Sequence, residues 1–183
     1  TGSTAVGLHI MRTCHVNNLK RVALELGGKS ASIVLKDADL ELAVRTNING
    51  ACCTAGQCCV APGRIFVQEE VYDEFVKMAV VEAKKRVVGD PFREDCEQGP
   101  QISEKQMENV LKFIEKGVNE GAKLVAGGKR LGEKGFFIEP TVFCDVTDDM
   151  IIAREEIFGP VLVIFKFKTI DEAIERANNS RYG

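Results

Sequence analysis

Apolar residues recur at two different spacings along the chain. Segments with an apolar residue at every third or fourth position, the spacing of one helix face, follow Asp39, Glu69, Ser103 and Thr169. Apolar runs with the alternation or continuity of strands lie between these segments, at residues 21–26, 32–35, 65–67, 122–126, 136–138, 141–143 and 161–167. Strands that alternate with helices in this way predict an α/β fold, in which helices flank a mostly parallel sheet.

The run at residues 161–167 is almost continuously apolar, so we expect a central strand that is buried on both faces of the sheet. The clearest helical pattern covers residues 69–88 and is ended by Gly89, Asp90 and Pro91. These two segments predict a sheet with helices packed on it.

Residues that can cap a helix precede the helical segments. Asp39 and Thr169 are suited to cap the segments that follow them, and Ser103 with Gln106 fits a capping box. Ser3 or Thr4 could cap a helix near the start of the chain. The small residues there could instead leave backbone N–H groups free for an anion or a polar ligand, and capping is the favoured interpretation.

Two pairs of adjacent cysteines lie on either side of a helix break. Cys52 and Cys53 continue the helical pattern after Asp39, and we interpret them as small core residues. Cys58 and Cys59 lie beyond Gly56, where a thiol can face solvent or a substrate. If the chain is an enzyme, we expect its nucleophile here, although the local pattern does not choose between Cys58 and Cys59.

Composition and charge exclude several classes of protein. The 183 residues are 45% hydrophobic and 28% charged with a net charge of -3, so no basic surface for nucleic acid or an anionic membrane is expected. No apolar run is long enough to cross a membrane, and the first residues lack the features of a secretory signal.

Seven cysteines, four of them in adjacent pairs, form a poor disulfide framework and favour a reducing compartment. We therefore expect an intracellular protein, cytoplasmic rather than mitochondrial. Structural zinc is disfavoured because the two histidines, His9 and His15, lie far upstream of the cysteines, and no metal site is predicted.

Glu25 ends an apolar run beside a Gly-Gly turn. It could be an edge-strand or salt-bridged carboxylate, or a general base in an apolar setting, and its neighbours do not separate these interpretations. The other Gly-Gly turn, at residues 127–128, does not have the glycine spacing of a dinucleotide fingerprint.

Four motifs occur in the order and spacing of one known family: Gly-Ser-Thr-Ala-Val-Gly at residues 2–7, Leu-Glu-Leu-Gly-Gly-Lys at 24–29, Gly-Gln-Cys-Cys at 56–59 and Glu-Glu-Ile-Phe-Gly-Pro at 155–160. The chain resembles the NAD(P)-dependent aldehyde dehydrogenase superfamily over essentially its whole length. The resemblance implies that residues 1–26 end a cofactor-binding domain and that residues 27–183 belong to a catalytic domain whose C-terminal part is missing.

The resemblance also implies a role for individual residues. The nucleophile falls on Cys59 and the general base on Glu25. The positions that would contact NAD or NADP are Gly2, Ser3, Thr4, Gly7, Leu26, Gln106, Glu156 and Phe158. Glu156 matches the carboxylate that binds the nicotinamide ribose, and Phe158 matches the aromatic residue beside it. At Gln106 the capping-box interpretation stays open as well.

The implied reaction is the oxidation of an aldehyde to a carboxylic acid through a thiohemiacetal and a thioester on Cys59. Glu25 would remove the thiol proton, directly or through water, and would later activate the hydrolytic water. The backbone N–H of Cys59 is one candidate donor to the oxyanion. We expect a small-molecule aldehyde as substrate and a homodimer or homotetramer for the complete protein.

The sequence also departs from the family's pattern. The amide that completes the family's oxyanion hole, and the lysine and glycines for the adenosine half of the cofactor, would lie upstream of Thr1. Small residues at 52–55 stand where aromatic residues often line the substrate channel, and Ala31 replaces a common proline. Two alternatives to an active enzyme are a non-catalytic, crystallin-like relative and an inactive truncated fragment that binds little cofactor.

Overall fold

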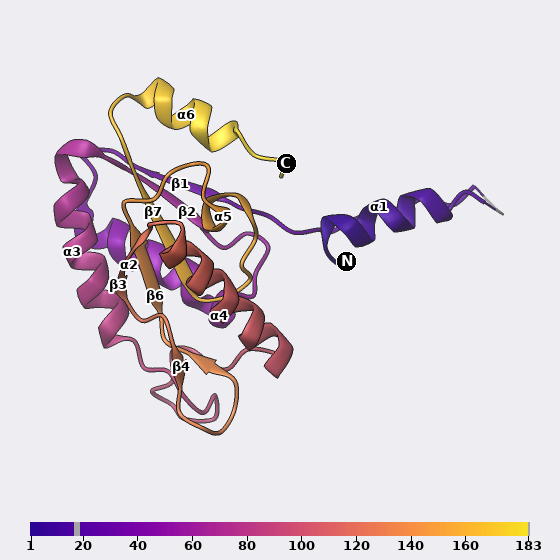
Figure 1. Ribbon diagram of the computed structural model, residues 1–183, viewed down its shortest axis with the longest axis horizontal. Coiled ribbons are helices and arrows are strands. Elements are labelled where there is room, and N and C mark those ends of the chain that lie inside the picture. Colours follow the sequence, from indigo (N-terminus) through magenta and orange to yellow (C-terminus); the bar gives the residue numbers. More distant parts are fainter. Residues whose placement is uncertain (17–18, 183) are drawn as a thin grey trace.

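The computed structural model describes residues 1–16 and 19–182. A sheet of five strands forms its centre, in the order β1-β2-β7-β6-β3 (Figure 1). The strands are β1 (Ala31–Val34), β2 (Arg64–Gln68), β3 (Lys123–Ala126), β6 (Thr141–Cys144) and β7 (Val161–Phe167). β1, β2, β7 and β6 are parallel to their neighbours, and only β3 is antiparallel to its partner β6. The predicted α/β fold with a mostly parallel sheet is confirmed.

Two hydrophobic cores lie on opposite faces of this sheet. Leu162 and Ile164 of β7 pack into one core with α2 (Leu40–Cys52) and α3 (Glu69–Lys85). Val163 and Phe165 point the other way, into a core with α4 (Glu104–Asn119), α5 (Ile151–Arg154) and α6 (Ile170–Asn178). Every residue of β7 except Lys166 is buried, so the prediction of a strand buried on both faces is confirmed.

The predicted helix caps are present. The side chain of Asp39 accepts a hydrogen bond from the Leu42 backbone N–H at 3.0 Å, and Thr169 accepts one from Glu172 at 3.2 Å. Helix α3 ends at Lys85, three residues before the predicted end at Val88. Val88 forms an isolated bridge with Gln98 instead, and this bridge draws the chain out of the helical path.

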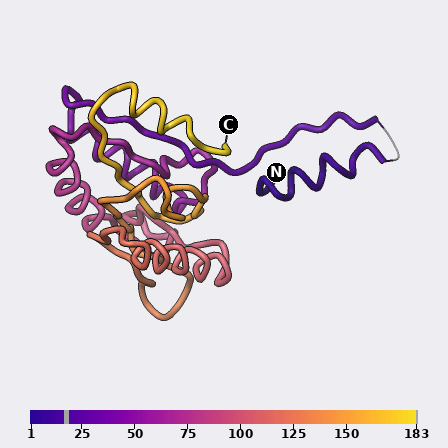
Figure 2. The backbone as a smooth tube through the Cα atoms, turned by 45° about the horizontal axis from the view of Figure 1, so that its top comes forward, coloured from indigo at the N-terminus to yellow at the C-terminus, as the bar shows by residue number. Residues whose placement is uncertain are grey.

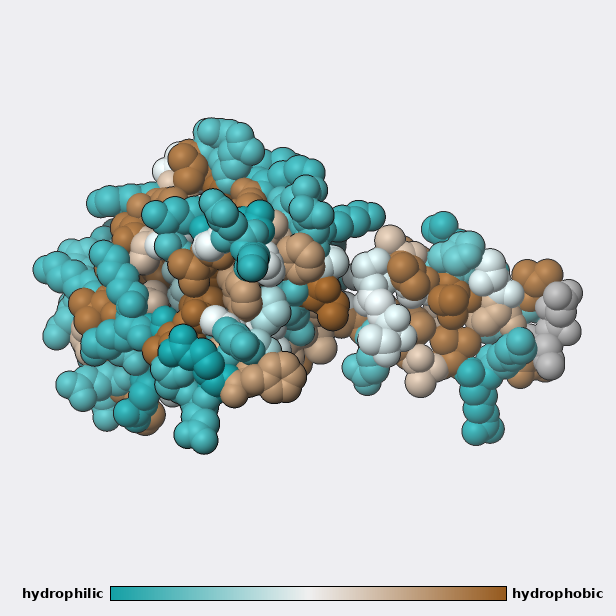
Figure 3. All heavy atoms as spheres, turned by 90° about the horizontal axis from the view of Figure 1, so that it is seen from below, coloured by the Kyte–Doolittle hydropathy of each residue, from teal (hydrophilic) through white to brown (hydrophobic). Residues whose placement is uncertain are grey.

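An arm, made of residues 1–16 and 19–26, stands apart from the sheet (Figures 1 and 2). It consists of α1 (Thr4–Thr13) and an extended segment that returns toward the sheet. Its helix exposes the apolar residues Val6, Leu8, Ile10 and Met11. Figure 3 shows the arm as a separate lobe with apolar patches on its surface. The described residues of the arm contribute nothing to either core.

The strand predicted at residues 21–26 is not formed. These residues alternate between exposed and half-buried positions, as a strand would, but none of them pairs with a strand. Residues 21–26 take part in one backbone hydrogen bond with the described residues: the carbonyl of Glu25 accepts from the N–H of Gly2 at 3.0 Å. The alternation predicted the extended path but not the absence of a neighbouring strand.

Two minor strands, β4 (Arg130–Leu131) and β5 (Phe137–Ile138), form a separate hairpin. The other predicted strand positions agree with the structure. No helix among residues 1–16 and 19–182 is long and apolar enough to span a membrane.

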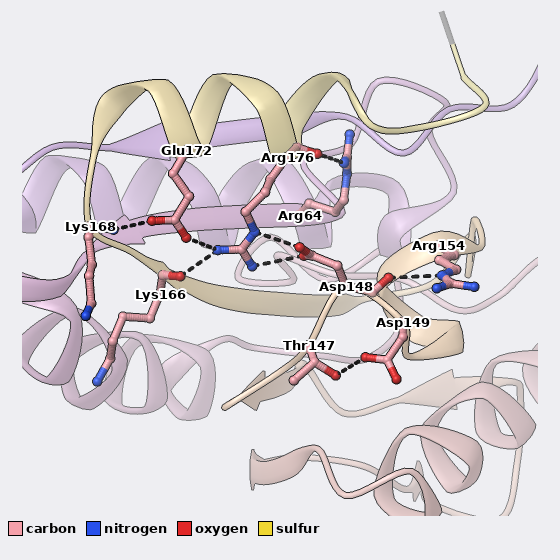
Figure 4. A network of polar contacts seen from close by, with 9 residues as sticks. All are labelled: Arg64, Thr147, Asp148, Asp149, Arg154, Lys166, Lys168, Glu172 and Arg176. Atoms are coloured by element: carbon pink, nitrogen blue, oxygen red, sulfur yellow. Dashed lines mark hydrogen bonds and ion pairs between the residues drawn. The ribbon is translucent and has the colours of Figure 1, made fainter.

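Arg176 of α6 joins several elements at one edge of the molecule (Figure 4). Its guanidinium donates two hydrogen bonds to Asp148, at 2.7 and 2.9 Å, and one each to Glu172 and the Lys166 carbonyl. Arg64, the first residue of β2, donates to the carbonyl of Arg176 and to that of Lys29. These contacts tie α6 to the strand that follows the cysteine segment.

Candidate active site

A cavity of about 610 Å³ brings together segments that are far apart in the sequence. Its lining comes from the start of the arm, the Gly-Gly turn, the cysteine segment, α4 and the loop before β7. It includes these residues that were predicted from the sequence: Cys59, Glu25, Gly2, Ser3, Leu26, Gln106, Glu156 and Phe158. Cys58 and Gln57 also line it.

Thr4 and Gly7 are not in this lining. Gly7 is buried on α1, and a Cβ atom added to it would lie 2.7 Å from Cδ1 of Leu26. Its role in the structure is to let α1 approach Leu26 closely. Thr4 is the first residue of α1 and is half-buried. Ser3 caps this helix by accepting a hydrogen bond from the Val6 N–H at 3.4 Å, as the favoured interpretation required.

The cysteine segment leaves α2 through a turn of left-handed backbone. A short 3₁₀ helix, η1 (Cys53–Gly56), follows α2 directly, and Thr54, Ala55 and Gly56 have φ angles of 49°, 55° and 72°. Beyond this turn Cys58 is half-buried and Cys59 is exposed. The backbone N–H of Cys59 has no hydrogen-bond partner in the part of the chain that the structure describes.

The adjacent residues Cys52 and Cys53 have different surroundings. Cys52 is fully buried, and this burial raises the pKa of its thiol to about 12, so it is an unreactive core residue as predicted. Cys53 is exposed, and its prediction as a core residue is wrong. The helix ends at Cys52, so Cys53 already belongs to the turn that leads away from the core.

The Gly-Gly turn touches both the cysteine segment and the loop before β7. A Cβ atom added to Gly28 would lie 2.3 Å from the carbonyl oxygen of Cys59, and one added to Gly27 would lie 2.1 Å from Oε2 of Glu156. The N–H of Gly28 donates a hydrogen bond to Oε1 of Glu156 at 3.2 Å. The backbone contact at Gly28 requires a residue without a side chain, whereas the Glu156 carboxylate near Gly27 could shift.

Glu25 lies two residues before Gly27 of this turn and is exposed. It does not sit in the apolar setting that one of the two interpretations proposed, because the strand expected to carry it has no neighbour to bury it. Its place in the lining of the cavity, with Cys59, leaves the carboxylate free to exchange a proton there.

Gln106 combines parts of both its interpretations. Its N–H donates to the side chain of Ser103 at 3.2 Å, which is one half of a capping box. Its side-chain amide does not complete the box. Instead Nε2 donates to the carbonyls of Ile157 and Phe158, at 3.3 and 2.9 Å. Gln106 therefore holds the loop that carries Glu156.

This loop has an unusual backbone at Phe158. The φ angle of Phe158 is 56°, in the left-handed region, and its ring is 37% exposed at the cavity. The carbonyl of Phe158 accepts the hydrogen bond from Gln106. The N–H of Glu156 donates to the hydroxyl of Tyr182 at 3.3 Å, which holds the loop from its other side.

Lys29 is a buried residue of this region to which the sequence reasoning gave no role. The pKa of its amine is lowered to about 7, chiefly by burial and also by nearby Arg64, while Glu156 and Glu155 oppose the shift. Its side chain packs against Gly63, where an added Cβ would lie 3.2 Å from the Lys29 Cδ. A lysine directly after two glycines gave no signal of burial.

No cluster of three or more histidine, cysteine, aspartate or glutamate side chains suited to a metal ion occurs within the described residues. The groups gathered at the cavity are instead two thiols, two carboxylates, an aromatic ring and a capped helix start. This set can support nucleophilic addition and proton transfer.

The family model of the aldehyde dehydrogenase family matches residues 1–183. The chain belongs to the aldehyde dehydrogenase family. The chain is 61% identical to retinal dehydrogenase 2 of Mus musculus and 56% identical to an aldehyde dehydrogenase of Enchytraeus buchholzi, over all 183 residues in each case. It covers 35% and 37% of those two proteins, so it spans about a third of their length.

Solved structures show the same relationship. The aldehyde dehydrogenase of Bacillus cereus in complex with NAD+ superimposes on the chain with a TM-score of 0.95 at 49% identity. The match covers 100% of this chain and 37% of that one. The resemblance inferred from the four motifs is confirmed.

Proposed function

We propose that the complete protein oxidises an aldehyde to a carboxylic acid with NAD+ or NADP+, with Cys59 as nucleophile and Glu25 as general base. The observation that carries this proposal is the shared cavity, which holds Cys59, Glu25 and six of the eight predicted cofactor contacts, from five separate segments. Membership of the aldehyde dehydrogenase family supports the class of reaction.

The residues at the cavity suit a nicotinamide nucleotide. Glu156 can accept hydrogen bonds from ribose hydroxyls, because its orientation is fixed by the Gly28 N–H. Phe158 offers an aromatic face beside it, and Gly2 and Ser3 let a ligand approach the start of α1. When bound, the cofactor supplies the acceptor for the hydride that leaves the substrate carbon. The Bacillus cereus relative is an NAD+ complex, which supports this choice.

Cys59 carries the first step. A free thiol is mostly protonated at neutral pH, so Glu25 accepts its proton, directly or through one water. The sulfur then bonds to the aldehyde carbon, and the carbonyl π electrons move to oxygen to give an oxyanion. The N–H of Cys59 donates to this oxygen, since no described residue occupies it. Return of the carbonyl after oxidation leaves a thioester on Cys59.

Glu25 carries the release step. Glu25 first passes the thiol proton to solvent, to which it is exposed. Its carboxylate then removes a proton from a water molecule whose oxygen attacks the thioester carbonyl. The carbon–sulfur bond breaks, the electron pair returns to Cys59 as thiolate, and the carboxylic acid leaves. An exposed carboxylate at the cavity has the access to water that this step needs.

A bulky aldehyde is the substrate class that we favour. The relative from Mus musculus is named retinal dehydrogenase 2, which supports including retinal among the test substrates.

The test measures turnover by the complete protein with a panel of short-chain, aromatic and polyene aldehydes. The readout is the absorbance of reduced nicotinamide. We expect Cys59→Ala and Glu25→Gln to lose activity by about a thousandfold or more. The matched control is Cys53→Ala, an exposed thiol outside the cavity lining, which should keep the activity. Equal rates for the native protein and Cys59→Ala would overturn the proposal.

The alternatives predict different results. A non-catalytic, crystallin-like relative would fold but show no turnover with any aldehyde. For residues 1–183 alone we propose an inactive piece, with residues 1–26 belonging to a cofactor domain and 27–183 to the catalytic domain. The separation of the arm from both cores supports this division. Calorimetric titration should show that the isolated chain binds NAD+ at least about tenfold more weakly than the complete protein, because part of the expected contact set is absent.

A further inference from the structure

The turn that precedes Cys59 holds a backbone conformation that its sequence disfavours. Thr54, Ala55 and Gly56 are successive residues with φ angles of 49°, 55° and 72°. Only glycine adopts this region without steric cost, and Thr54 is β-branched, for which it is least favourable. Ala55 is also 1% exposed. A strained turn persists only where the surrounding structure holds it.

The restraint comes from the segment that leads into α4. Nε2 of Gln101 donates a hydrogen bond of 2.9 Å to the carbonyl of Ala55, the middle residue of the turn. Gln57, at the end of the turn, donates from Nε2 to the carbonyls of Thr54 and Pro100, at 3.0 and 3.3 Å. Its Oε1 accepts from the N–H of Ile102 at 2.8 Å. Residues 100–102 and the turn are therefore fastened together by their amides.

Gln101 is itself held firmly. Its side chain is buried, at 2% exposure, and its backbone N–H donates to the Phe136 carbonyl at 2.8 Å. It does not line the cavity, so it contacts neither a substrate nor a cofactor there. Any effect of Gln101 on the reaction must pass through the turn to Cys59.

We propose that Gln101 is a positioning residue for Cys59. By holding the Ala55 carbonyl, it keeps the left-handed turn in place, and the turn sets where the thiol meets Glu25 and the substrate. Loss of the bond lets the turn relax toward ordinary backbone angles and displaces the thiol. This inference rests on the proposed role of Cys59.

The chain contains a matched control in Gln98. It is also 2% exposed, and its Nε2 donates one hydrogen bond of similar length, 2.8 Å, to the carbonyl of Ile138. Oε1 lacks a partner among the described residues in both glutamines. Gln98, however, fastens the hairpin strand β5 and not the cysteine turn. The two substitutions should therefore cost similar stability and differ only in their effect on Cys59.

The experiment compares Gln101→Met and Gln98→Met in the complete protein. Three quantities are measured: the melting temperature, kcat and KM for aldehyde and cofactor, and the rate of Cys59 alkylation by iodoacetamide, followed by peptide mass spectrometry. We expect similar shifts in melting temperature. Only Gln101→Met should lower kcat and the alkylation rate, by about tenfold to a hundredfold, while KM for the cofactor changes less than about twofold. Equal kcat and alkylation rates in the two variants would overturn the proposal.

Two further variants keep the test decisive. Gln101→Glu preserves the size but replaces the donor to the Ala55 carbonyl by an acceptor, so it should reproduce the loss even if Gln101→Met folds poorly. Ala55→Gly relieves the left-handed strain of the turn. Adding it to Gln101→Met should therefore recover at least about half of the loss in the logarithm of the alkylation rate, so that a hundredfold loss becomes about tenfold or less. No recovery, with the fold intact, would contradict the proposed route through the turn.

The alkylation rate separates this inference from the proposed function. If the complete protein oxidises no aldehyde, the proposed function fails, and the alkylation rates still decide whether Gln101 positions Cys59. If the protein is active and Cys59→Ala is not, while the two glutamine variants behave alike, only the inference fails.

Discussion

Gly28 and Cys59 are in direct backbone contact. A Cβ atom at Gly28 would lie 2.3 Å from the Cys59 carbonyl oxygen, well inside the distance that two non-bonded atoms tolerate. Gly28 follows the proposed general base by three positions in the sequence, and Cys59 is the proposed nucleophile. The geometry that brings the base and the nucleophile to one cavity therefore depends on the absence of a single side chain.

We predict that Gly28→Ala lowers turnover by the complete protein by about tenfold or more, because the backbone of Cys59 must move away from the new methyl group. Alkylation of Cys59 by iodoacetamide should slow in parallel. Gly89→Ala is the control, since a Cβ atom there meets nothing within 4 Å. If Gly28→Ala matched this control in both measurements, the contact would not matter for Cys59.

Gly56 and Gly132 form a second matched pair. Both have left-handed backbone, with φ angles of 72° and 69°. A Cβ at Gly56 would also lie 2.0 Å from the Gly159 carbonyl oxygen, whereas one at Gly132 meets nothing within 4 Å. Alanine at Gly132 should lower the free energy of unfolding by about 1–2 kcal/mol, through its φ angle alone.

Alanine at Gly56 should lower the free energy of unfolding by about 3 kcal/mol or more, because the contact with the Gly159 carbonyl adds to the cost of the left-handed backbone. Urea unfolding of both variants, followed by circular dichroism, measures the difference. Similar losses would mean that the backbone of Gly159 moves aside without cost.

Lys29 should make stability depend on pH. The pKa of its amine is lowered from 10.5 to about 7 in the folded protein, chiefly by burial. Between these two pH values the unfolded chain binds a proton that the folded chain does not, so the free energy of unfolding rises with pH. The rise is at most about 1.4 kcal/mol for each pH unit.

Lys29→Met should remove this contribution to the pH dependence, and Lys112→Met, at an exposed lysine, should retain it. Urea unfolding across the range from about 7 to about 10.5 measures both. An unchanged slope in Lys29→Met would show that Lys29 stays protonated in the folded protein.

Arg176 should contribute more to stability than an exposed ion pair does. Its side chain is 19% exposed and binds Asp148 through two nitrogens, and its guanidinium also lies over the ring of Phe165 (Figure 4 shows its polar partners). Lysine cannot reproduce a planar, two-point contact, so Arg176→Lys should lower the free energy of unfolding by about 2 kcal/mol.

Arg93→Lys is the matched control, because Arg93 also contacts its aspartate through two nitrogens but both partners are 59% exposed. We expect little change there, as exposed pairs are screened by water. Thermal unfolding of the two variants compares them directly, and equal shifts would argue against a special role for Arg176.

The sequence predicts those features whose cause is local. The apolar run at 161–167 fixes a strand buried on both faces, and Asp39, Ser103 and Thr169 cap their helices as expected. The alternation at 21–26 fixes an extended path, but whether such a path becomes a strand depends on a neighbour, which local pattern does not encode.

Features imposed by distant contacts could not be predicted. The left-handed angles of Thr54 and Ala55 contradict the preferences of both residues and depend on Gln101, which lies more than forty positions away. The exposure of Cys53 follows from the same turn. The burial of Lys29 likewise arises from segments that meet only in the folded chain. The candidate site residues were found through motifs, whereas the contacts that hold them required the structure.

The central claim is that Cys59 carries a thioester that Glu25 helps to release. The most direct measurement uses the complete Glu25→Gln protein, incubated with aldehyde and NAD+ at about pH 9, where a free thiol ionises without a base. The mixture is then quenched in acid, digested and analysed by peptide mass spectrometry. We predict an acyl group on Cys59 and not on Cys58, seen as a mass increase equal to the mass of the aldehyde less two hydrogens. An acyl group on Cys58, or none on either residue in a protein whose native form is active, would contradict the account.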